Sequence, residues 1–162
     1  MATLQKVRTC LWFDDQAEAA LALYVSLFAD GKITSLNRSG PENKVLTAAA
    51  HFGGQQVIGL NGGPLFPHTP AFSFSVICDD QAEVDRLWLA LLENGGKPGQ
   101  CGWLSDSFGV SWQIVPQRFY DLMDHPDPET RGRVFQAMLK MIKLDIDALE
   151  KAAQEKRNTA YE

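Results

Sequence analysis

Polar side chains able to form hydrogen bonds occupy alternate positions of a short run near residue 112. Ser111 and Gln113 alternate there with apolar residues over positions 110–115. Because successive side chains of a β-strand point to opposite faces, the run predicts a strand with one apolar face and one polar face. A polar strand face contacts either a ligand or water, and the pattern alone is typical of both.

A turn precedes this strand, and its chemistry is structural. Residues 105–109 read Ser-Asp-Ser-Phe-Gly, and Trp103 lies in the extended run before them. Asp and Ser side chains bond to nearby backbone, and Gly permits positive φ. We expect Asp106 to cap this hairpin and not to act as a catalytic acid.

An internal repeat organises the elements that carry these residues. Asp14–Glu18 recurs letter for letter as Asp79–Glu83, an offset of 65, and Gly31-Lys32 aligns with Gly96-Lys97 in the same frame. A repeat of this length indicates a supersecondary unit that occurs twice. Residues 65 apart, beginning with Asp15 and Asp80, should therefore occupy equivalent places.

Each copy combines strand-like alternation with one amphipathic helix. In the first copy we expect a strand at 6–13, a helix at 16–28 capped by Asp14 or Asp15, and strands at 32–38, 44–52 and 55–61. In the second we expect a strand at 71–78, a helix at 81–93, a degraded strand at 97–100 that contains Pro98, and the hairpin described above.

The pattern as a whole predicts an α+β fold. Two pseudo-symmetric β-α-β-β-β modules would be followed by C-terminal helices that start at Asp127 and Asp145. We expect a single domain over 1–162, with module one at 1–62, a linker at 63–70, module two at 71–118 and the C-terminal helices at 127–155.

Overlaying the two copies predicts which strand faces line the cup. The inward sets would be Arg8, Cys10 and Trp12 with Val57, Gly59 and Asn61 in copy one, and Ser73, Ser75 and Ile77 with Ser111, Gln113 and Val115 in copy two. The predicted ligand-binding residues are Arg8, Trp12, Asn61, Ser73, Ser75, Trp103, Ser111 and Gln113. The alternative is an exposed sheet on which Arg8 and Gln113 bond to each other or to water.

Composition excludes several classes of partner. The net charge of −5 argues against a sequence-independent nucleic-acid binder and against docking on an anionic membrane. The three cysteines are widely spaced and form no Cys-x-x-Cys pair, which favours a reducing cytoplasm. The start of the sequence has no apolar run of the kind found in secretion signals, which also favours the cytoplasm.

Three segments carry a family resemblance. They are Leu11-Trp12-Phe13-Asp14 with Ala17-Glu18-Ala19-Ala20 and Tyr24, then Cys101-Gly102-Trp103-Leu104 through Trp112-Gln113-Ile114-Val115-Pro116, and Gln136–Met141. Together they resemble the PhnB-like family, often labelled 3-demethylubiquinone-9 3-methyltransferase, of the vicinal oxygen chelate superfamily. Glyoxalases, extradiol dioxygenases and bleomycin-resistance proteins belong to that superfamily. The resemblance implies that the two modules form a cupped mixed sheet with helices outside, and usually a dimer.

The resemblance also implies where a divalent metal would bind. The superfamily's ligand positions fall on Arg8, Gly59, Ser73 and Gln113, or one residue later on Thr9, Leu60, Phe74 and Ile114. Neither set supplies the His and carboxylate ligands that a catalytic metal needs, so no cofactor is predicted, and a divalent metal stays an alternative that the ligand residues do not support. A strand–Gly-x-Gly–helix signature for a nucleotide-type cofactor is also missing from the sequence.

Three functions remain open from the residues. The first is metal-free binding of a small aromatic or otherwise planar molecule near Trp12, Trp103 and Phe108. The second is an enzyme of the superfamily or the methyltransferase of the family label. The third is a dimeric interaction module. The residues do not decide whether the chain is an enzyme. We expect a homodimer because Phe135, Met138, Leu139 and Ile142 form an apolar stripe.

Overall fold

The structure, a computed structural model, describes residues 5–155. The chain divides into two compact units, Met1–His68 and Thr69–Glu162. The division falls inside the segment that the sequence marks as a linker. No helix among the described residues is long and apolar enough to cross a membrane.

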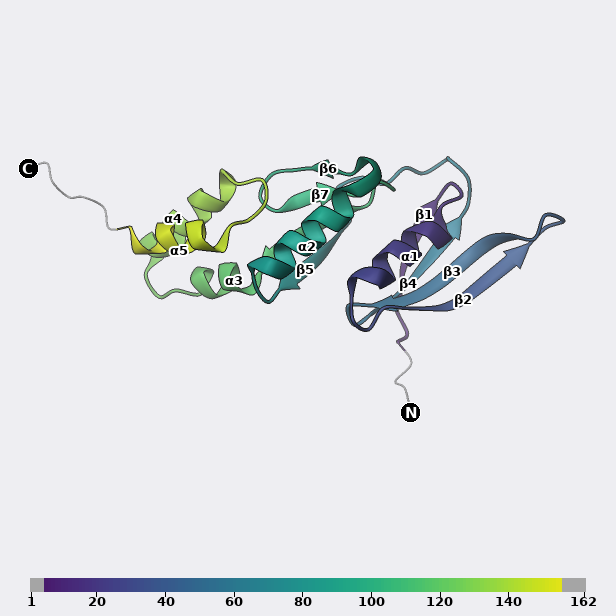
Figure 1. Cartoon of the computed structure of the whole chain (residues 1–162), viewed down its shortest axis with the longest axis horizontal. Coiled ribbons are helices and arrows are strands. Elements are labelled where there is room, and N and C mark those ends of the chain that lie inside the picture. The colour runs from purple at the N-terminus through teal and green to yellow at the C-terminus, as the bar shows by residue number, and fades with distance from the viewer. Residues whose placement is uncertain (1–4, 156–162) are drawn as a thin grey trace, which may run out of the picture. The chain divides into compact units, whose positions relative to one another are not determined.

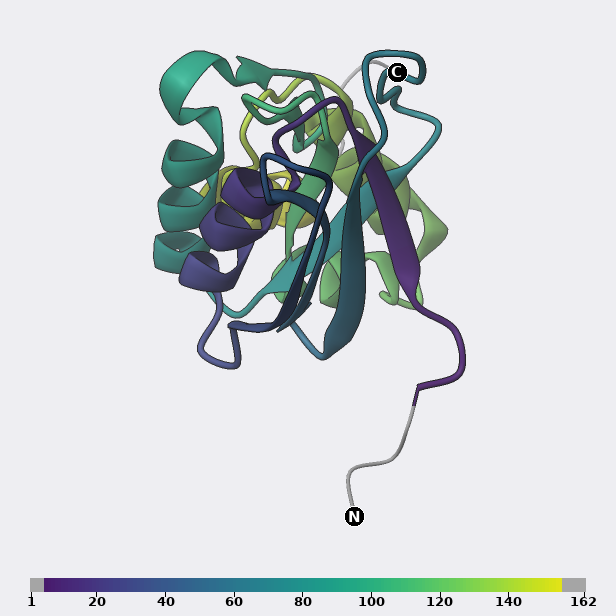
Figure 2. The same ribbon diagram turned by 90° about the vertical axis from the view of Figure 1, so that its right-hand side faces the viewer.

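The first unit is one β-α-β-β-β module (Figure 1). Its elements are β1 (Thr9–Phe13), α1 (Ala17–Leu27), β2 (Lys32–Ser39), β3 (Lys44–Phe52) and β4 (Gln55–Asn61). The strands form a sheet in the order β1-β4-β3-β2, in which β1 and β4 are parallel and the other pairs antiparallel. Figure 2 shows α1 lying along one face of this sheet.

The second unit repeats this topology and adds helices. Its module contains β5 (Ser73–Cys78), α2 (Gln81–Leu92), a short 3₁₀ turn (Glu93–Gly95), β6 (Lys97–Pro98), β7 (Trp103–Ser105) and β8 (Ser111–Pro116). The strand order is β5-β8-β7-β6, again with the first and last strands of the module parallel. The predicted α+β class and the two β-α-β-β-β modules are therefore confirmed.

The module helices are positioned by the apolar residues that they bury. In α1, Ala17, Ala20, Leu21, Tyr24 and Leu27 recur at helical spacing and are buried. Gly59 on β4 permits this approach, because a Cβ at that position would lie 2.9 Å from the Cβ of Ala17. The close contact fixes which face of the first sheet the helix covers.

The two module helices begin differently, and one predicted cap is wrong. Asp80 caps α2 by accepting a hydrogen bond from the Glu83 backbone N–H at 2.9 Å. In α1, by contrast, the cap position is Gln16, and its side chain makes no capping bond. The side chain of Asn61 on β4 replaces the predicted Asp14 or Asp15, since its Oδ1 accepts from the Ala17 N–H at 2.8 Å.

A carboxylate fixes the turn that joins β3 to β4. The two carboxylate oxygens of Asp30 accept the backbone N–H groups of Gly53 and Gly54, each at 2.8 Å. These bonds and the nearby His51 lower the pKa of Asp30. The loop after α1 is thereby tied to the β3–β4 hairpin.

Three further helices follow β8: α3 (Gln117–Met123), α4 (Pro128–Leu139) and α5 (Ile146–Gln154). Asp127 and Asp145 cap α4 and α5, as their sequence predicts. Helix α3 was not predicted, and its first position has no capping side chain. Leu122, Val134 and Leu149, one from each helix, form a shared apolar core.

Backbone bonds join these helices to the second sheet. The N–H groups of Cys101 and Gly102 donate to the carbonyls of Met141 and Ile142, each at 2.8 Å. Both donors have positive φ, 59° for Cys101 and 82° for Gly102, and glycine at the second position adopts this conformation without strain. The segment after α4 is thus bonded directly to the turn before β7.

Candidate functional site

Register places a set of polar side chains on one face of the second sheet. Ser73 pairs with Ser111 and Ser75 pairs with Gln113 between β5 and β8, while Trp103 of β7 pairs with Gln113. Paired residues of neighbouring strands point to the same side of a sheet. We call the side that carries Ser73, Ser75, Trp103, Ser105, Ser111 and Gln113 the open face of the second sheet.

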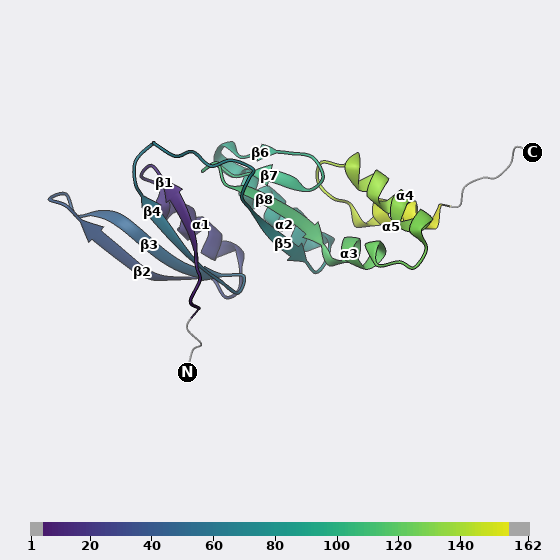
Figure 3. The ribbon, with the colours of Figure 1, turned by 180° about the vertical axis from the view of Figure 1, so that it is seen from behind.

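The opposite side of this sheet is apolar. Phe74, Leu104, Trp112 and Ile114 alternate with the residues of the open face and are buried. Helix α2 packs on this side through Val84, Leu87 and Leu91. Figure 3 shows β8 in front of α2, so the viewer looks at the side of β8 that faces away from the helix. The open face therefore has no helix of its own module on it.

Hydrogen bonds on the open face leave several donors without partners. Gln113 donates from Nε2 to Ser73 Oγ at 3.0 Å, one of the partners that the sequence predicts for it. The Ser111 residue is 4% exposed, and its hydroxyl makes no hydrogen bond within residues 5–155 but stays open to solvent. Ser75 is exposed, and Trp103 is half-buried beside Gln113. The face thus combines an anchored amide, hydroxyl groups and an indole ring.

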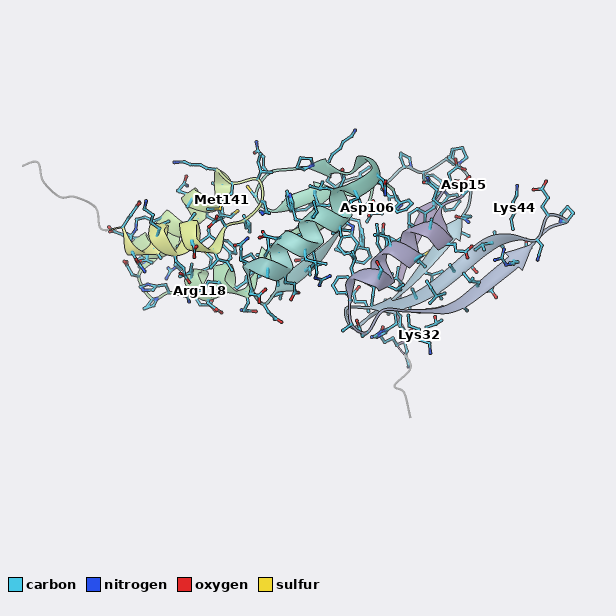
Figure 4. The ribbon with its side chains drawn as sticks, in the orientation of Figure 1. Asp15, Lys32, Lys44, Asp106, Arg118 and Met141 are labelled. Atoms are coloured by element: carbon cyan, nitrogen blue, oxygen red, sulfur yellow. The ribbon has the colours of Figure 1, made fainter. Side chains whose placement is uncertain are left out.

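Asp106 fixes the hairpin that supplies two strands of this face. Its Oδ1 accepts the backbone N–H groups of Phe108 and Val110 at 2.9 and 3.0 Å, and its Oδ2 accepts the indole N–H of Trp112 at 2.9 Å. Asp106 is 3% exposed, and Figure 4 labels it within the second unit. These bonds agree with the predicted structural role, because they occupy both carboxylate oxygens.

The first unit carries the other predicted residues, and they are held differently. The indole N–H of Trp12 donates to the carbonyl of Gly63 at 2.8 Å, and its ring meets that of Phe66 edge-on at 4.9 Å. Trp12 thus packs against the linker. Arg8 is exposed before β1 and lines a groove of about 360 Å³ with Gln5 and residues 54–56.

The predicted inward face of β4 is wrong by one residue. Val57 is fully buried, Gly59 approaches Ala17, and Asn61 bonds to the first turn of α1 through Oδ1 and to the Val45 carbonyl through Nδ2. These residues face α1, so both ends of the Asn61 amide have structural partners. The middle of β4 is apolar on both faces, with Val57 and Gly59 on one and Ile58 and Leu60 on the other, so the pattern could not decide between them.

The structure therefore separates the eight predicted residues into three groups. Ser73, Ser75, Trp103, Ser111 and Gln113 lie together on the open face of the second sheet. Arg8 and Trp12 belong to the first unit, and Asn61 is part of the α1 contact. Phe108 lies in the turn that Asp106 organises. The predicted ligand-binding residues did not include Ser105 and Lys97, which strand pairing places on the same side of the second sheet as Ser111.

A second groove lies at the start of α1. It measures about 610 Å³ and is lined by Asp14, Asp15, Glu18, Arg38, Ser39, Glu42, Asn43, Lys44, Val45, Leu46 and Asn61. Figure 4 places Asp15 near the start of α1 and Lys44 near the β2–β3 turn. Its basic groups pair locally, Arg38 with Glu18 at 4.0 Å and Lys44 with Glu42. The groove therefore offers no uncompensated cation for a ligand.

The metal positions implied by the superfamily do not fit a divalent ion. Gly59 faces α1, and Ser73 already accepts from Gln113. No group of three His, Cys, Asp or Glu side chains in the described chain is arranged to hold a metal. Serine and glutamine alone make a poor donor set for a catalytic metal.

The three cysteines differ in their surroundings. Cys10 is exposed, whereas Cys101 is half-buried and Cys78 is fully buried. Burial, aided by the charge of Glu83, raises the pKa of the Cys78 thiol to about 12. No cysteine among the described residues has an activating histidine beside it in a bond that the structure records.

Thiol titration tests this assignment. A disulfide reagent at pH 8 should react fastest with Cys10 and should reach Cys78 only after unfolding, because a thiolate is required and Cys78 resists ionisation. Cys10→Ser should remove the fastest phase. Loss of that phase in Cys78→Ser instead would contradict the described burial.

Comparison with known proteins agrees with the fold and the resemblance. The sequence model of the family described as 3-demethylubiquinone-9 3-methyltransferase matches residues 5–115. A Bacillus cereus protein named PhnB is 30% identical, with 69% of this chain and 99% of that chain covered and a TM-score of 0.64. A Pseudomonas aeruginosa protein shares the fold at 22% identity, with 70% and 98% covered and a TM-score of 0.59.

No curated protein matches the chain. The family match covers both β-α-β-β-β modules, including β5, β7 and nearly all of β8, and ends before α3. The open face of the second sheet therefore lies in the part of the chain that the family shares. The chain belongs to the PhnB-like family that is described as 3-demethylubiquinone-9 3-methyltransferase.

Proposed function

We propose that this protein binds a small planar molecule on the open face of the second sheet, without a metal ion. The observation that carries the proposal is the grouping of Ser73, Ser111 and Gln113 beside Trp103 on one sheet face that no helix of its module covers. The Ser111 hydroxyl has no hydrogen-bond partner within the described chain and is open to solvent, so it is free to bond to a ligand. A small molecule with an apolar ring and a few polar groups suits such a mixed face.

The neighbouring side chains favour a planar ligand. Trp103 is half-buried and lies beside Gln113 across the β7–β8 pair. An indole face that stacks on another ring contributes about 0.5–1.5 kcal/mol beyond the area that it buries. Gln113 is anchored through Nε2 to Ser73, so its carbonyl oxygen is oriented without an entropic cost on binding.

The other two functions have weaker support. An enzyme needs an activated nucleophile or a positioned acid or base, and the open face contains serines and glutamine without a histidine or carboxylate bonded to them. For the interaction module and the predicted homodimer, the relevant surface is the exposed stripe of Phe135, Leu139 and Ile142, while Met138 packs into the helical core. The homodimer and the cytoplasmic location stay predictions.

Substitution of Gln113 tests the binding proposal. With the neutral probe 2-naphthamide, Gln113→Ala should weaken binding roughly threefold to tenfold, the range expected for one lost neutral hydrogen bond. Its melting should change little, because the Gln113–Ser73 bond is only partly buried. Isothermal titration and thermal melting measure the two effects.

Gln136→Ala is the matched control, since Gln136 is exposed on α4 and its side chain makes no hydrogen bond within the described chain. This variant should bind and melt like the parent protein. Equal binding by Gln113→Ala and Gln136→Ala would overturn the proposal. Saturable binding weakened only in Gln113→Ala would support it.

A further inference from the structure

A row of donor groups crosses the whole second sheet beside Trp103. Ser73 pairs with Ser111, Ser111 with Ser105, and Ser105 with Lys97, so the four side chains follow one line over β5, β8, β7 and β6. Because paired residues share a side, Lys97 lies on the same side as the open face. We call these four residues the donor row.

The donor row carries an uncompensated positive charge. Lys97 is the only Lys, Arg, His, Asp or Glu residue in the four strands of this sheet. It is exposed and takes part in no ion pair within residues 5–155. Asp106, the residue after Ser105, accepts three N–H donors of its own turn.

The hydroxyl groups of the row are available to donate. The Ser111 side chain lies on the open-face side of β8, and its hydroxyl has no partner in the described chain and is open to solvent. Ser105 is half-buried and also unbonded, while Ser73 accepts from Gln113 and so retains its own hydroxyl hydrogen. Three hydroxyl donors and one ammonium group match the lone pairs of an oxyanion.

The equivalent row of the first unit has different chemistry. Lys32, the residue 65 positions before Lys97, pairs with His51. There the carboxylate of Asp30 lies 3.3 Å from His51 Nδ1. A carboxylate that pairs with His51, the strand neighbour of Lys32, disfavours an anion at the equivalent place of the first unit.

We propose that the ligand of the open face is an aryl oxyanion, with its carboxylate or phosphate on Lys97, Ser105 and Ser111 and its ring on Trp103. Adjacent strands lie about 4.8 Å apart, so Lys97 needs to span only the gap to Ser105. Trp103 and Ser105 are two residues apart on one strand, roughly 7 Å, which separates the ring from the anionic group. This inference rests on the proposed function and adds the ligand's charge.

Three probes of one ring system separate charge from shape. We expect 2-naphthoate or 2-naphthyl phosphate to bind about tenfold more tightly than neutral 2-naphthamide, the gain of one charge-assisted hydrogen bond. The tighter of the two anions identifies the group for which the row is built. Lys97→Gln should abolish the tenfold preference, and binding of 2-naphthamide should stay within about twofold.

Lys140→Gln is the matched control, because Lys140 is an exposed lysine of the same unit at the end of α4. It removes the same charge and should keep the preference for the anion. Ser111→Ala should weaken the anion roughly threefold or more, as expected for one lost hydrogen bond.

Equal affinities for the anions and the amide would overturn this inference and leave the proposed function standing, provided that Gln113→Ala still weakens binding. An equal loss in Lys97→Gln and Lys140→Gln would also overturn it, since the effect would then be one of net charge. Failure of all three probes to bind would overturn both proposals.

Discussion

Replacing Asp106 with alanine is expected to destabilise the protein by about 3–5 kcal/mol, the range for removing one partner of a buried charged network. The carboxylate accepts the N–H groups of Phe108, Val110 and Trp112 at 2.9–3.0 Å and is 3% exposed. Alanine would leave these donors without an acceptor, and each one that stays buried costs about 1–3 kcal/mol. Urea unfolding followed by circular dichroism measures the loss.

Two variants control this result. Asp106→Asn retains one acceptor oxygen but turns an NH₂ group toward a donor, so its stability should fall between that of the parent and that of Asp106→Ala. Asp147→Ala removes an exposed aspartate and should change stability by less than about 0.5 kcal/mol. Asp106→Ala with the stability of Asp147→Ala would show that the turn does not depend on the carboxylate.

Replacing Gly31 with alanine is expected to cost about 3 kcal/mol or more, at the upper end of overpacking. A Cβ on Gly31 would lie 1.8 Å from the backbone oxygen of Val25. The clash is with main chain at the end of α1, so no side-chain rotation relieves it. Gly96 is the counterpart of Gly31 65 residues later, and a Cβ added there would lie 2.6 Å from the backbone oxygen of Leu91. Gly96→Ala should therefore also destabilise the protein, but by less than Gly31→Ala.

Gly132→Ala is the control for these glycine variants. Gly132 lies inside α4, and nothing is within 4 Å of its Cβ position, so alanine should stabilise the helix by about 0.5–1 kcal/mol. Melting temperatures should therefore rank Gly132→Ala, parent, Gly96→Ala and Gly31→Ala from highest to lowest. A Gly31→Ala protein with the melting temperature of the parent would contradict the close approach of Gly31 to the backbone of Val25.

The repeat explains why the topology was predictable from the sequence. Gly31-Lys32 and Gly96-Lys97 mark the point in each copy where the chain leaves its helix and starts the second strand. At both places only glycine fits below the end of the helix. The predicted bounds of β3 and β4 agree with the structure, because Gly-rich turns flank both strands.

Other features depended on tertiary contacts that no local pattern reports. The cap of α1 comes from Asn61, which is 44 residues from the N–H that it accepts. The approach of Ala17 to Gly59 decides which face of β4 packs against α1. The local pattern could not decide this, because Ile58 and Leu60 on the other face are also apolar. Helix α3 lacks a capping side chain, so the sequence carried no start signal for it.

The sequence predicts the open face only in part. Period-two alternation alone puts Ser111 and Gln113 on one side of β8. Lys97 was missed because β6 is two residues long and includes Pro98, so only its pairing with β7 reveals its side. The charge of the donor row is therefore a property of the folded sheet, not of a motif.

The most direct test of binding on the open face is a two-dimensional amide NMR titration of the whole protein with 2-naphthoate, with the Trp103 indole signal assigned through Trp103→Phe. Binding on the open face predicts saturable shifts at the Trp103 indole, the Gln113 side-chain amide and the backbone amides of Ser73, Ser105 and Ser111, all from one sheet face. Saturable shifts confined to other residues, such as those of the groove at the start of α1, would contradict it, and so would the absence of saturable shifts.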